Sequence, residues 1–360
     1  MKKNILLNFL LCFCTLFLTG CTHLFFAPTR YAYSNPVDEG YIDEAFTFES
    51  KDGTKLTGMF FPSRTAVTKG TVVHFHGNGQ NMTSHYRSIA WIAAHGYNVV
   101  TFDYRGYGAS GGRAGSVPGA VLDSVAALQT ALDLPGVNVD KVIVYGQSLG
   151  TAMALAAVAE SGFEPAAVIL EGSFYSYKGE ARAVLAKHWI TWPFLWLPTV
   201  AISDKFAPKD EIKHIKAPKL FIHSVKDTLV PYSQGKKLYK AAPEPKLFWD
   251  VPAGHVEAFT FYGNYFSPRL LEYLDKVLKN KPGAEDSNVY LIDEPTRTMK
   301  LKSSLEEKDN NMPGTGMQNG TAGNTTVNNA GEAGVKQTGT DFEDIPDMSD
   351  RQTEETGVFR

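Results

Sequence analysis

A serine between two glycines separates a strand-forming run from a helix-forming run near the middle of this chain. The run KVIVYG ends at Gly146, and the run LGTAMALAAVAE begins at Leu149. The residues Gly146-Gln147-Ser148-Leu149-Gly150 between them have the spacing G-x-S-x-G. In a strand–turn–helix context, this spacing places a serine on a strained corner with its hydroxyl exposed above a sheet, and the glycines let neighbouring backbone pass closely. The pattern predicts a nucleophile elbow at Ser148, formed by Gly146 and Gly150.

Strand-like and helix-like runs alternate on both sides of this corner. AFTFES and LTGMFFP flank the turn Lys51-Asp52-Gly53 and predict a hairpin. Further strands are predicted at GTVVHFHG, YNVVTFDYRG, AAVILEGS, KLFIHSVKD and KLFWDVPAGH, and further helices at YRSIAWIAAHG and PGAVLDSVAALQTALD. The alternation predicts the α/β class, with a mostly parallel sheet and helices on both faces. Residues 174–216 hold no clear strand and predict a helical insertion.

A serine nucleophile needs a base, and the base needs an acid to orient it. In a sheet of this kind the acid and then the histidine follow the serine along the chain. Asp227 follows one predicted strand and His255 follows the next, so both lie where strand ends carry the sites of open α/β sheets. We predict a triad of Ser148, Asp227 and His255. An alternative is that Asp227 caps a helix that begins nearby.

An oxyanion needs preset hydrogen-bond donors. The backbone N–H of Leu149, at the predicted helix start, is one candidate. The second is the N–H of Asn78 in HGNGQN, where Gly77 allows a tight turn. The glycines of DYRGYGASGG lack the GK[ST] ending of a phosphate-binding loop, so we interpret this segment as a loop fixed by Asp103 and Arg105.

Residues from about 41 to 279 resemble the α/β-hydrolase superfamily. The motifs HGNGQN, DYRGYGASGG, GQSLG, KDTLVP and GH are similar to those of the abhydrolase-domain serine hydrolases, which include thioesterase-like and lysophospholipase-like members. This resemblance implies an eight-stranded sheet, no cofactor, and a lid inserted after the sixth strand. The segment 174–216 matches that lid.

The amino-terminal residues have the order of a secretory signal: Lys2 and Lys3, an apolar stretch over Ile5–Leu18, and then small residues. Leu18-Thr19-Gly20-Cys21 resembles the lipobox of bacterial lipoproteins. By that resemblance, Cys21 is acylated and becomes the first mature residue, which anchors the chain in the bacterial cell envelope. Thr22, rather than an aspartate, favours the outer membrane in a cell with two membranes. An uncleaved signal anchor and a buried apolar helix are the alternatives.

Composition sets the remaining expectations. The three cysteines all lie near the amino end, so the body of the chain has neither a disulfide framework nor a cysteine-based metal site, and no metal is expected. A net charge of −3 does not indicate nucleic-acid binding. We expect a signal peptide over 1–20, a lipidated tether over 21–40, a hydrolase domain over 41–281, and a disordered acidic tail over 282–360. The sequence does not indicate an oligomeric state.

These observations predict a membrane-anchored serine hydrolase acting on a small-molecule or lipid acyl ester or thioester. A serine peptidase on the same fold and a non-catalytic lipoprotein scaffold are the alternatives. Trp189, Trp192 and Trp196 recur at near-helical spacing in the insertion. They either attach the lid to the body, or form an acyl pocket or a membrane-facing surface.

Overall fold

The computed structural model describes residues 25–279. The predicted signal peptide, Cys21 and the predicted tail lie outside the described residues. Between residues 25 and 279, no helix has both the length and the apolar character that a bilayer crossing requires.

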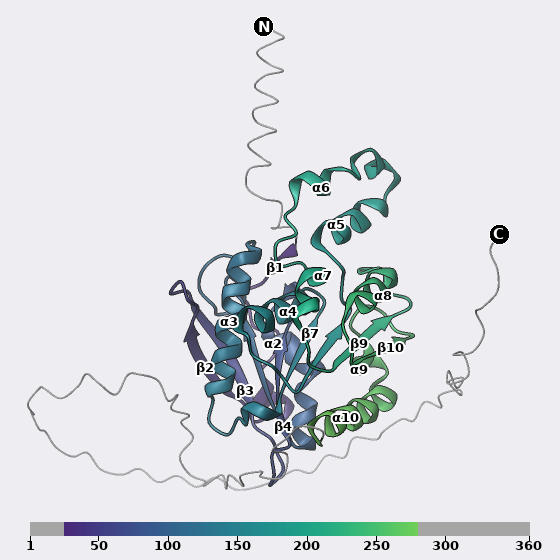
Figure 1. Ribbon diagram of the computed structural model, residues 1–360. Coiled ribbons are helices and arrows are strands. Elements are labelled where there is room, and N and C mark those ends of the chain that lie inside the picture. Colours follow the sequence, from purple (N-terminus) through teal and green to yellow (C-terminus); the bar gives the residue numbers. More distant parts are fainter. Residues whose placement is uncertain (1–24, 280–360) are drawn as a thin grey trace, which may run out of the picture. The chain divides into compact units, whose positions relative to one another are not determined.

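An eight-stranded sheet forms the centre of the domain (Figure 1). Its strands are β2 (Glu44–Glu49), β3 (Lys55–Phe61), β4 (Gly70–Phe75), β6 (Tyr97–Asp103), β7 (Val142–Gln147), β8 (Ala167–Glu171), β9 (Lys219–Ser224) and β10 (Lys246–Val251). Their spatial order is β10-β9-β8-β7-β4-β6-β3-β2. The hairpin β2–β3 is antiparallel, β3 runs antiparallel to β6, and every other pair is parallel. The predicted mostly parallel sheet is confirmed, with its antiparallel strands at one edge.

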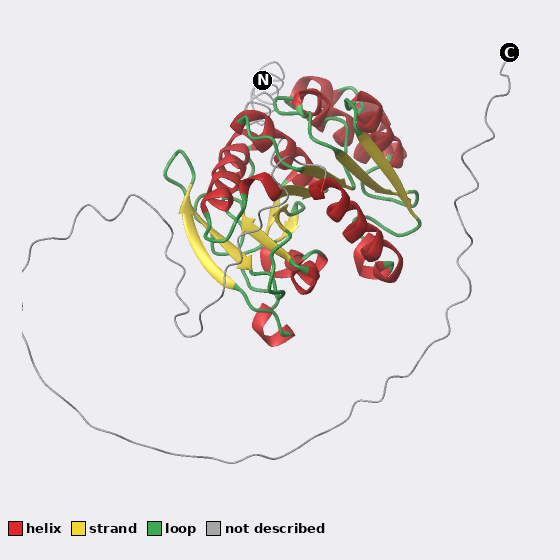
Figure 2. Ribbon diagram, turned by 60° about the horizontal axis from the view of Figure 1, so that its bottom comes forward, coloured by secondary structure: helices red, strands yellow, loops and turns green. Residues whose placement is uncertain are grey.

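Helices cover both faces of the sheet (Figure 2). They include α3 (Val117–Asp133), α4 (Leu149–Ser161) and α8 (Tyr232–Ala241) on one face, and a 3-10 helix (Ala90–His95) and α10 (Gly263–Lys279) on the other. Leu128, Leu155 and Leu238 share one apolar core, and Ile92 and Leu274 belong to a second core. Because both faces are covered, the central strands β4, β6 and β7 are buried along their whole length, which explains their apolar runs.

One predicted helix forms only in part. YRSIAWIAAHG follows a short α2 (Met82–His85) and folds into two 3-10 turns, Tyr86–Ser88 and Ala90–His95. Ile89 lies between these turns with φ −137°, outside the helical region, and this interrupts a continuous α-helix. Gly96, with φ 95°, ends the second turn as predicted.

The segment between β8 and β9 consists of short helices and loops and contains no strand, as the sequence predicts. It contains α5 (Tyr177–Ala186), a 3-10 turn (Trp189–Phe194), α6 (Leu197–Ala201), α7 (Pro208–Glu211) and a second 3-10 turn (Ile212–His214). It follows the sixth strand of the eight-stranded sheet. Figure 1 shows α5 and α6 standing away from the sheet. We call residues 174–216 the insertion.

Residues 25–40 are packed on the domain, although the sequence suggested a tether. Phe26 is buried in the core beside the sheet. The short strand β1 (Ala27–Pro28) pairs in parallel with β5 (Gly79–Gln80). Asn81 donates its side-chain amide to the carbonyls of Thr29 (3.1 Å) and Tyr31 (2.8 Å). We call residues 25–34 the amino-terminal strap, and it is part of the folded domain.

Candidate active site

Ser148 lies between the end of β7 and the start of α4, with φ 52° and ψ −119°. A side chain rarely adopts this backbone conformation, so the surrounding structure has to hold it in place. A Cβ added to Gly150 would lie 1.9 Å from the carbonyl oxygen of Phe75. A Cβ on Gly146 would lie 2.5 Å from the carbonyl oxygen of Gly150. Both glycines therefore permit the close packing that holds the corner, and the predicted elbow geometry is present.

Asp227 and His255 are joined by a hydrogen bond. His255 donates from Nδ1 to Asp227 Oδ2 at 2.6 Å, which leaves Nε2 as the acceptor nitrogen of the neutral ring. Asp227 Oδ1 accepts the backbone N–H groups of Leu229 and Val230, each at 2.9 Å. Burial opposes ionisation of Asp227, yet the hydrogen bond from His255 and the two backbone bonds outweigh it and hold the pKa of this carboxyl below its usual value.

The alternative role of Asp227 as a helix cap is wrong. Helix α8 begins at Tyr232, and its N-cap is Pro231. The backbone groups that Asp227 accepts belong to the loop before the helix. They fix the carboxylate beside His255 instead of starting α8.

The end of β8 brings the serine and the histidine to the same place. The backbone N–H of Ser148 donates to the carbonyl of Glu171 at 2.8 Å. A Cβ on the next residue, Gly172, would lie 2.8 Å from Cε1 of His255. One strand end therefore contacts both the elbow and the imidazole ring, and the glycine there gives the ring its space.

The loop after β4 lies beside the elbow. A Cβ on Gly77 would lie 3.7 Å from Cβ of Ser148. The carbonyl of Asn78 accepts the N–H of Ala27 (2.9 Å) and the hydroxyl of Tyr107 (2.6 Å), which fixes the Asn78–Gly79 peptide. Leu149 is the first residue of α4, so its N–H has no acceptor within the helix. The assignment of the Asn78 and Leu149 amides as oxyanion donors stays a prediction.

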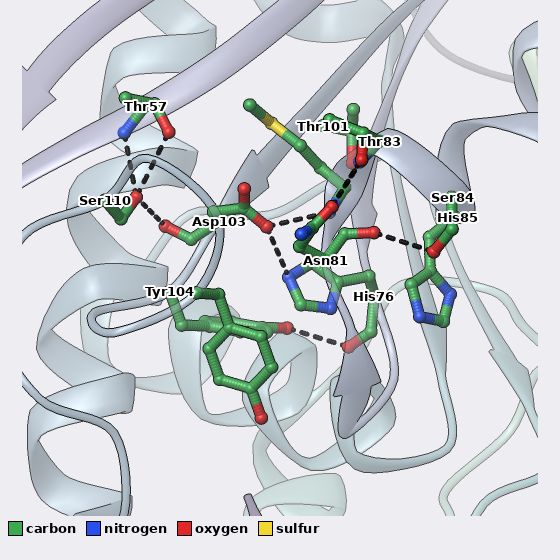
Figure 3. Close-up of polar contacts among 12 residues, drawn as sticks. Thr57, His76, Asn81, Thr83, Ser84, His85, Thr101, Asp103, Tyr104 and Ser110 are labelled. Carbon is green, nitrogen blue, oxygen red and sulfur yellow. Dashed lines mark hydrogen bonds and ion pairs between the residues drawn. The ribbon is translucent and has the colours of Figure 1, made fainter. Parts of the chain in front are cut away.

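A buried polar cluster supports this loop from behind (Figure 3). Asp103 Oδ1 accepts the N–H of Met82 at 2.7 Å and lies 3.3 Å from His76 Nε2. Tyr104 donates its hydroxyl to the carbonyl of His76 at 3.2 Å. Asn81 caps α2 by accepting the N–H of Thr83 at 3.0 Å. The loop of residues 76–81 is thus tied to the ends of β4 and β6.

The side chain of Arg105 fixes the glycine-rich loop, as the sequence suggested, whereas Asp103, whose side chain was expected to do the same, contributes its backbone carbonyl. Arg105 makes a two-point contact with the buried Asp123 at 2.9 and 2.7 Å and reaches Asp52 at 2.8 Å. The carbonyl of Asp103 accepts the hydroxyl of Ser110 at 2.7 Å. These contacts account for the polar residues of this loop without a phosphate ligand.

Sequence reasoning missed Glu171, the last residue of β8. Its carboxylate is buried and accepts the hydroxyl of Tyr145, the amide of Gln147 (2.8 Å) and the N–H of Ala258 (3.3 Å). Burial raises the pKa of Glu171, and those hydrogen bonds oppose the rise. Ala258 lies three residues after His255, so Glu171 connects the elbow to the histidine loop. An acid at the end of the apolar run AAVIL was the available signal.

Glu180 is a second acid that the sequence did not single out. It lies on α5 and accepts the side-chain amide of Gln234 at 2.9 Å. Burial raises the pKa of Glu180 to about 7, while the charge of Lys187 lowers it and that of Asp227 raises it.

Three further histidines make structural contacts. The ring of His74 contacts the side chains of Thr101 (3.3 Å) and Gln147 (2.9 Å), and burial lowers its pKa to about 3. His76 contacts the carbonyl of Gly77 at 2.8 Å. His223 donates to the carbonyl of Val230 at 3.1 Å.

Comparison with known proteins agrees with this geometry. The family model described as serine aminopeptidase, S33, matches residues 66–210, a range that includes Ser148. A protein of Escherichia coli O157:H7 called YfhR is 30% identical over 280 residues, which covers 76% of this chain and 94% of YfhR. The chain belongs to the α/β-hydrolase superfamily. Together with the matched family model, this membership makes it a hydrolase.

Two further relatives of this hydrolase are named for their activities. Lysophosphatidylserine lipase ABHD12 of Macaca fascicularis is 30% identical over 240 residues, which covers 62% of this chain and 60% of that protein. The solved structure of the Pyrococcus furiosus esterase Pf2001 is similar with a TM-score of 0.55 at 21% identity, covering 70% of this chain and 98% of the esterase. This last likeness concerns the fold alone.

Proposed function

We propose that this hydrolase cleaves carboxylic esters or thioesters through an acyl-enzyme on Ser148, and that an acylated Cys21 holds it on a bacterial envelope membrane. The observation that carries the catalytic part is the Asp227–His255 hydrogen bond beside the strained Ser148 corner. The name of the relative lysophosphatidylserine lipase ABHD12 supports an ester as substrate. The order of charged, apolar and small residues before Cys21 supports the anchor.

In the proposed reaction, Oγ of Ser148 attacks the acyl carbon while Nε2 of His255 takes the hydroxyl proton. The bond to the leaving group breaks, and His255 returns the proton to the departing alcohol or thiol. Asp227 holds the ring tautomer and stabilises the imidazolium. The N–H groups of Asn78 and Leu149 stabilise the oxyanion. Water then attacks the acyl-enzyme with the same base, which releases the acid and regenerates the serine.

A fluorophosphonate probe tests the nucleophile directly. We expect the wild-type chain to be labelled and the Ser148→Ala variant to be unlabelled, with unchanged thermal stability. Ester turnover by Ser148→Ala should fall by roughly a thousandfold or more. Labelling of Ser148→Ala at the wild-type rate would place the nucleophile elsewhere. A panel of p-nitrophenyl esters and acyl thioesters of rising chain length then defines the substrate.

Metabolic labelling with a fatty-acid analogue tests the anchor. The wild-type protein should carry the label and the Cys21→Ser variant should not. An unlabelled wild-type protein would refute the anchor while leaving the catalytic proposal standing.

A serine peptidase is the second candidate, because the matched family model is described as a serine aminopeptidase. The Ser–His–Asp chemistry is the same for both, and the leaving group distinguishes them. Turnover of an aminoacyl p-nitroanilide that exceeds turnover of the matching p-nitrophenyl ester would favour the peptidase.

A further inference from the structure

We propose that the insertion docks this hydrolase on an anionic bilayer through an aromatic cap, which consists of Trp189, Ile190, Trp192, Phe194 and Trp196. The proposal rests on the membrane anchoring put forward above and adds a second point of attachment to it. The sequence left three roles open for the tryptophans: attaching the insertion to the body, lining an acyl pocket, or facing a membrane.

The exposure of the cap excludes the first role. Its five side chains are between 52% and 76% exposed, and no residue of the turn Trp189–Phe194 is buried. A tryptophan that attached the insertion to the body would be covered by the body. A contiguous exposed apolar patch of this kind marks an interaction site.

Two polar side-chain groups in the turn Trp189–Phe194 are already satisfied. The indole N–H of Trp192 donates to the carbonyl of Ala186 at 3.1 Å, and the hydroxyl of Thr191 donates to the carbonyl of His188 at 2.6 Å. Transfer of these side chains from water into the boundary of a bilayer therefore leaves neither donor unpaired, which removes the main cost of burying them. Tryptophan is also a preferred residue at membrane–water boundaries.

The positive charge of the insertion favours a bilayer with anionic lipids. Residues 181–203 contain no aspartate or glutamate, and Arg182 is exposed. Lys187 is exposed as well, although its ammonium bonds backbone carbonyls of the loop after Asp227. Basic side chains beside an apolar face are attracted to anionic headgroups, each by about 1 kcal/mol near the surface. An apolar protein partner would not require this one-sided charge.

The amino-terminal strap brings the proposed anchor to the same part of the domain. Phe25 packs against Phe174 and against Tyr177, with ring centroids 6.4 and 5.2 Å apart. These two residues lie at the base of the insertion, because Tyr177 is the first residue of α5. Cys21 precedes Phe25 by four residues, which span at most about 14 Å when extended. An acyl chain on Cys21 therefore keeps the base of the insertion close to the bilayer.

Docking in this way would turn the candidate triad toward the lipid. Lys187 donates its ammonium to the carbonyls of Thr228 and Leu229, directly after Asp227. Leu229, in the Asp227 loop, and Phe261, the last residue of α9 (Ala258–Phe261), are exposed apolar residues themselves. Lys187 thus joins the insertion to the loop that carries Asp227.

The test uses the mature chain, residues 21–360, with Cys21→Ser, so that binding cannot come from an acyl group. Co-sedimentation with vesicles of phosphatidylcholine alone, or mixed with phosphatidylglycerol, measures partitioning. Brominated lipids quench tryptophans that enter the bilayer, and three of the five tryptophans lie in the cap. The test variant carries Trp189→Ser, Trp192→Ser and Trp196→Ser. The matched control carries serine at three exposed apolar positions elsewhere, Val67, Val139 and Leu247.

We expect the chain and its control to bind anionic vesicles and to show quenching, and the triple tryptophan variant to bind about tenfold less or weaker still. Equal binding by the two triple variants, absence of quenching, or a cap-dependent dimer in sedimentation velocity without vesicle binding would each overturn the proposal. Turnover of a short ester and a melting curve on the same samples report catalysis and folding separately. Failure of docking is therefore distinguishable from failure of the proposed hydrolysis or acylation.

Discussion

Ser148 has a strained backbone conformation, and the residues packed around it hold that conformation in place. Phe75 and Thr151 occupy the space next to Gly150 and Gly146, and the N–H of Ser148 is tied to β8. The strain is therefore maintained by the sheet itself. A strained residue fixed in this way is preorganised, so no rearrangement is needed when a substrate arrives.

Asp227→Asn is expected to lower kcat for a short ester by about a thousandfold. An asparagine can offer an N–H to Nδ1 of His255, which would favour the wrong ring tautomer. The melting temperature should change much less than kcat. Asp250→Asn is the control, since Asp250 is also an acid on the β10 side of the site but bonds the hydroxyl of Tyr232 at 2.5 Å. Equal kcat for the Asp227→Asn and Asp250→Asn variants would mean that another acid orients the base.

The raised pKa of Glu180 predicts how the free energy of unfolding depends on pH. Its pKa in the folded state is about 7, above the ordinary value of 4.5. The folded state therefore retains a proton that the unfolded state releases, and the stability associated with this group is lost as the pH rises from about 4.5 to about 7.

Glu180→Gln removes that loss while its amide oxygen can still accept from Gln234. The variant should melt at a higher temperature than the wild type at pH 8, and the difference should shrink toward pH 5. Melting curves across this range measure it. A constant difference at every pH would show that Glu180 does not titrate in this window.

Some residues of the site could be predicted from local sequence and others could not. Ser148, Asp227 and His255 each stand next to a strand or helix signal, so their positions follow from chain order and the edge of a parallel sheet. The role of Glu171 depends on donors from β7 and from the loop after His255. These donors come together only through strand pairing, which no local pattern specifies.

At the scale of elements, pairing between segments far apart in the chain determines the structure of residues whose local propensity is weak. The aromatic residues after Thr22 suggested a tether because no strand or helix period runs through them. The structure places Ala27 and Pro28 beside Gly79 and Gln80, about fifty residues further along the chain. The hairpin at Lys51-Asp52-Gly53 was predictable by contrast, since its pairing is set by the turn itself.

The strap gives a test at this scale. Ala27→Pro removes the N–H that donates to the carbonyl of Asn78. We expect kcat for a short ester to fall by about threefold to tenfold, which corresponds to the free energy of one hydrogen bond. KM and the melting temperature should change little. Ala27→Ser keeps the N–H and should behave as wild type. If the two variants have the same kcat, the strap does not position the loop after β4.

At the scale of the whole molecule, the described fold ends with an apolar helix. Leu274 and Leu278 of α10 are buried in the second core. The residues after α10 contain few large apolar side chains. The sequence predicts that they are disordered, and they lie outside the described residues. We expect deletion of residues 283–360 to leave both the melting temperature and short-ester turnover unchanged. A lower melting temperature in the shortened chain would show that the tail contributes to the core.

The pairing of β1 with β5 also has a mechanical consequence. If the amino terminus is fixed in a membrane, any pull on the body is carried first by the strap, whose strand pairing spans only two residues on each side. That pair would open before the eight-stranded sheet, because the sheet shares its load among many more hydrogen bonds. The first part of the body to be displaced would be the loop at Asn78, beside Ser148. Tension on the anchor would therefore reach the loop beside Ser148 before it reaches the central sheet.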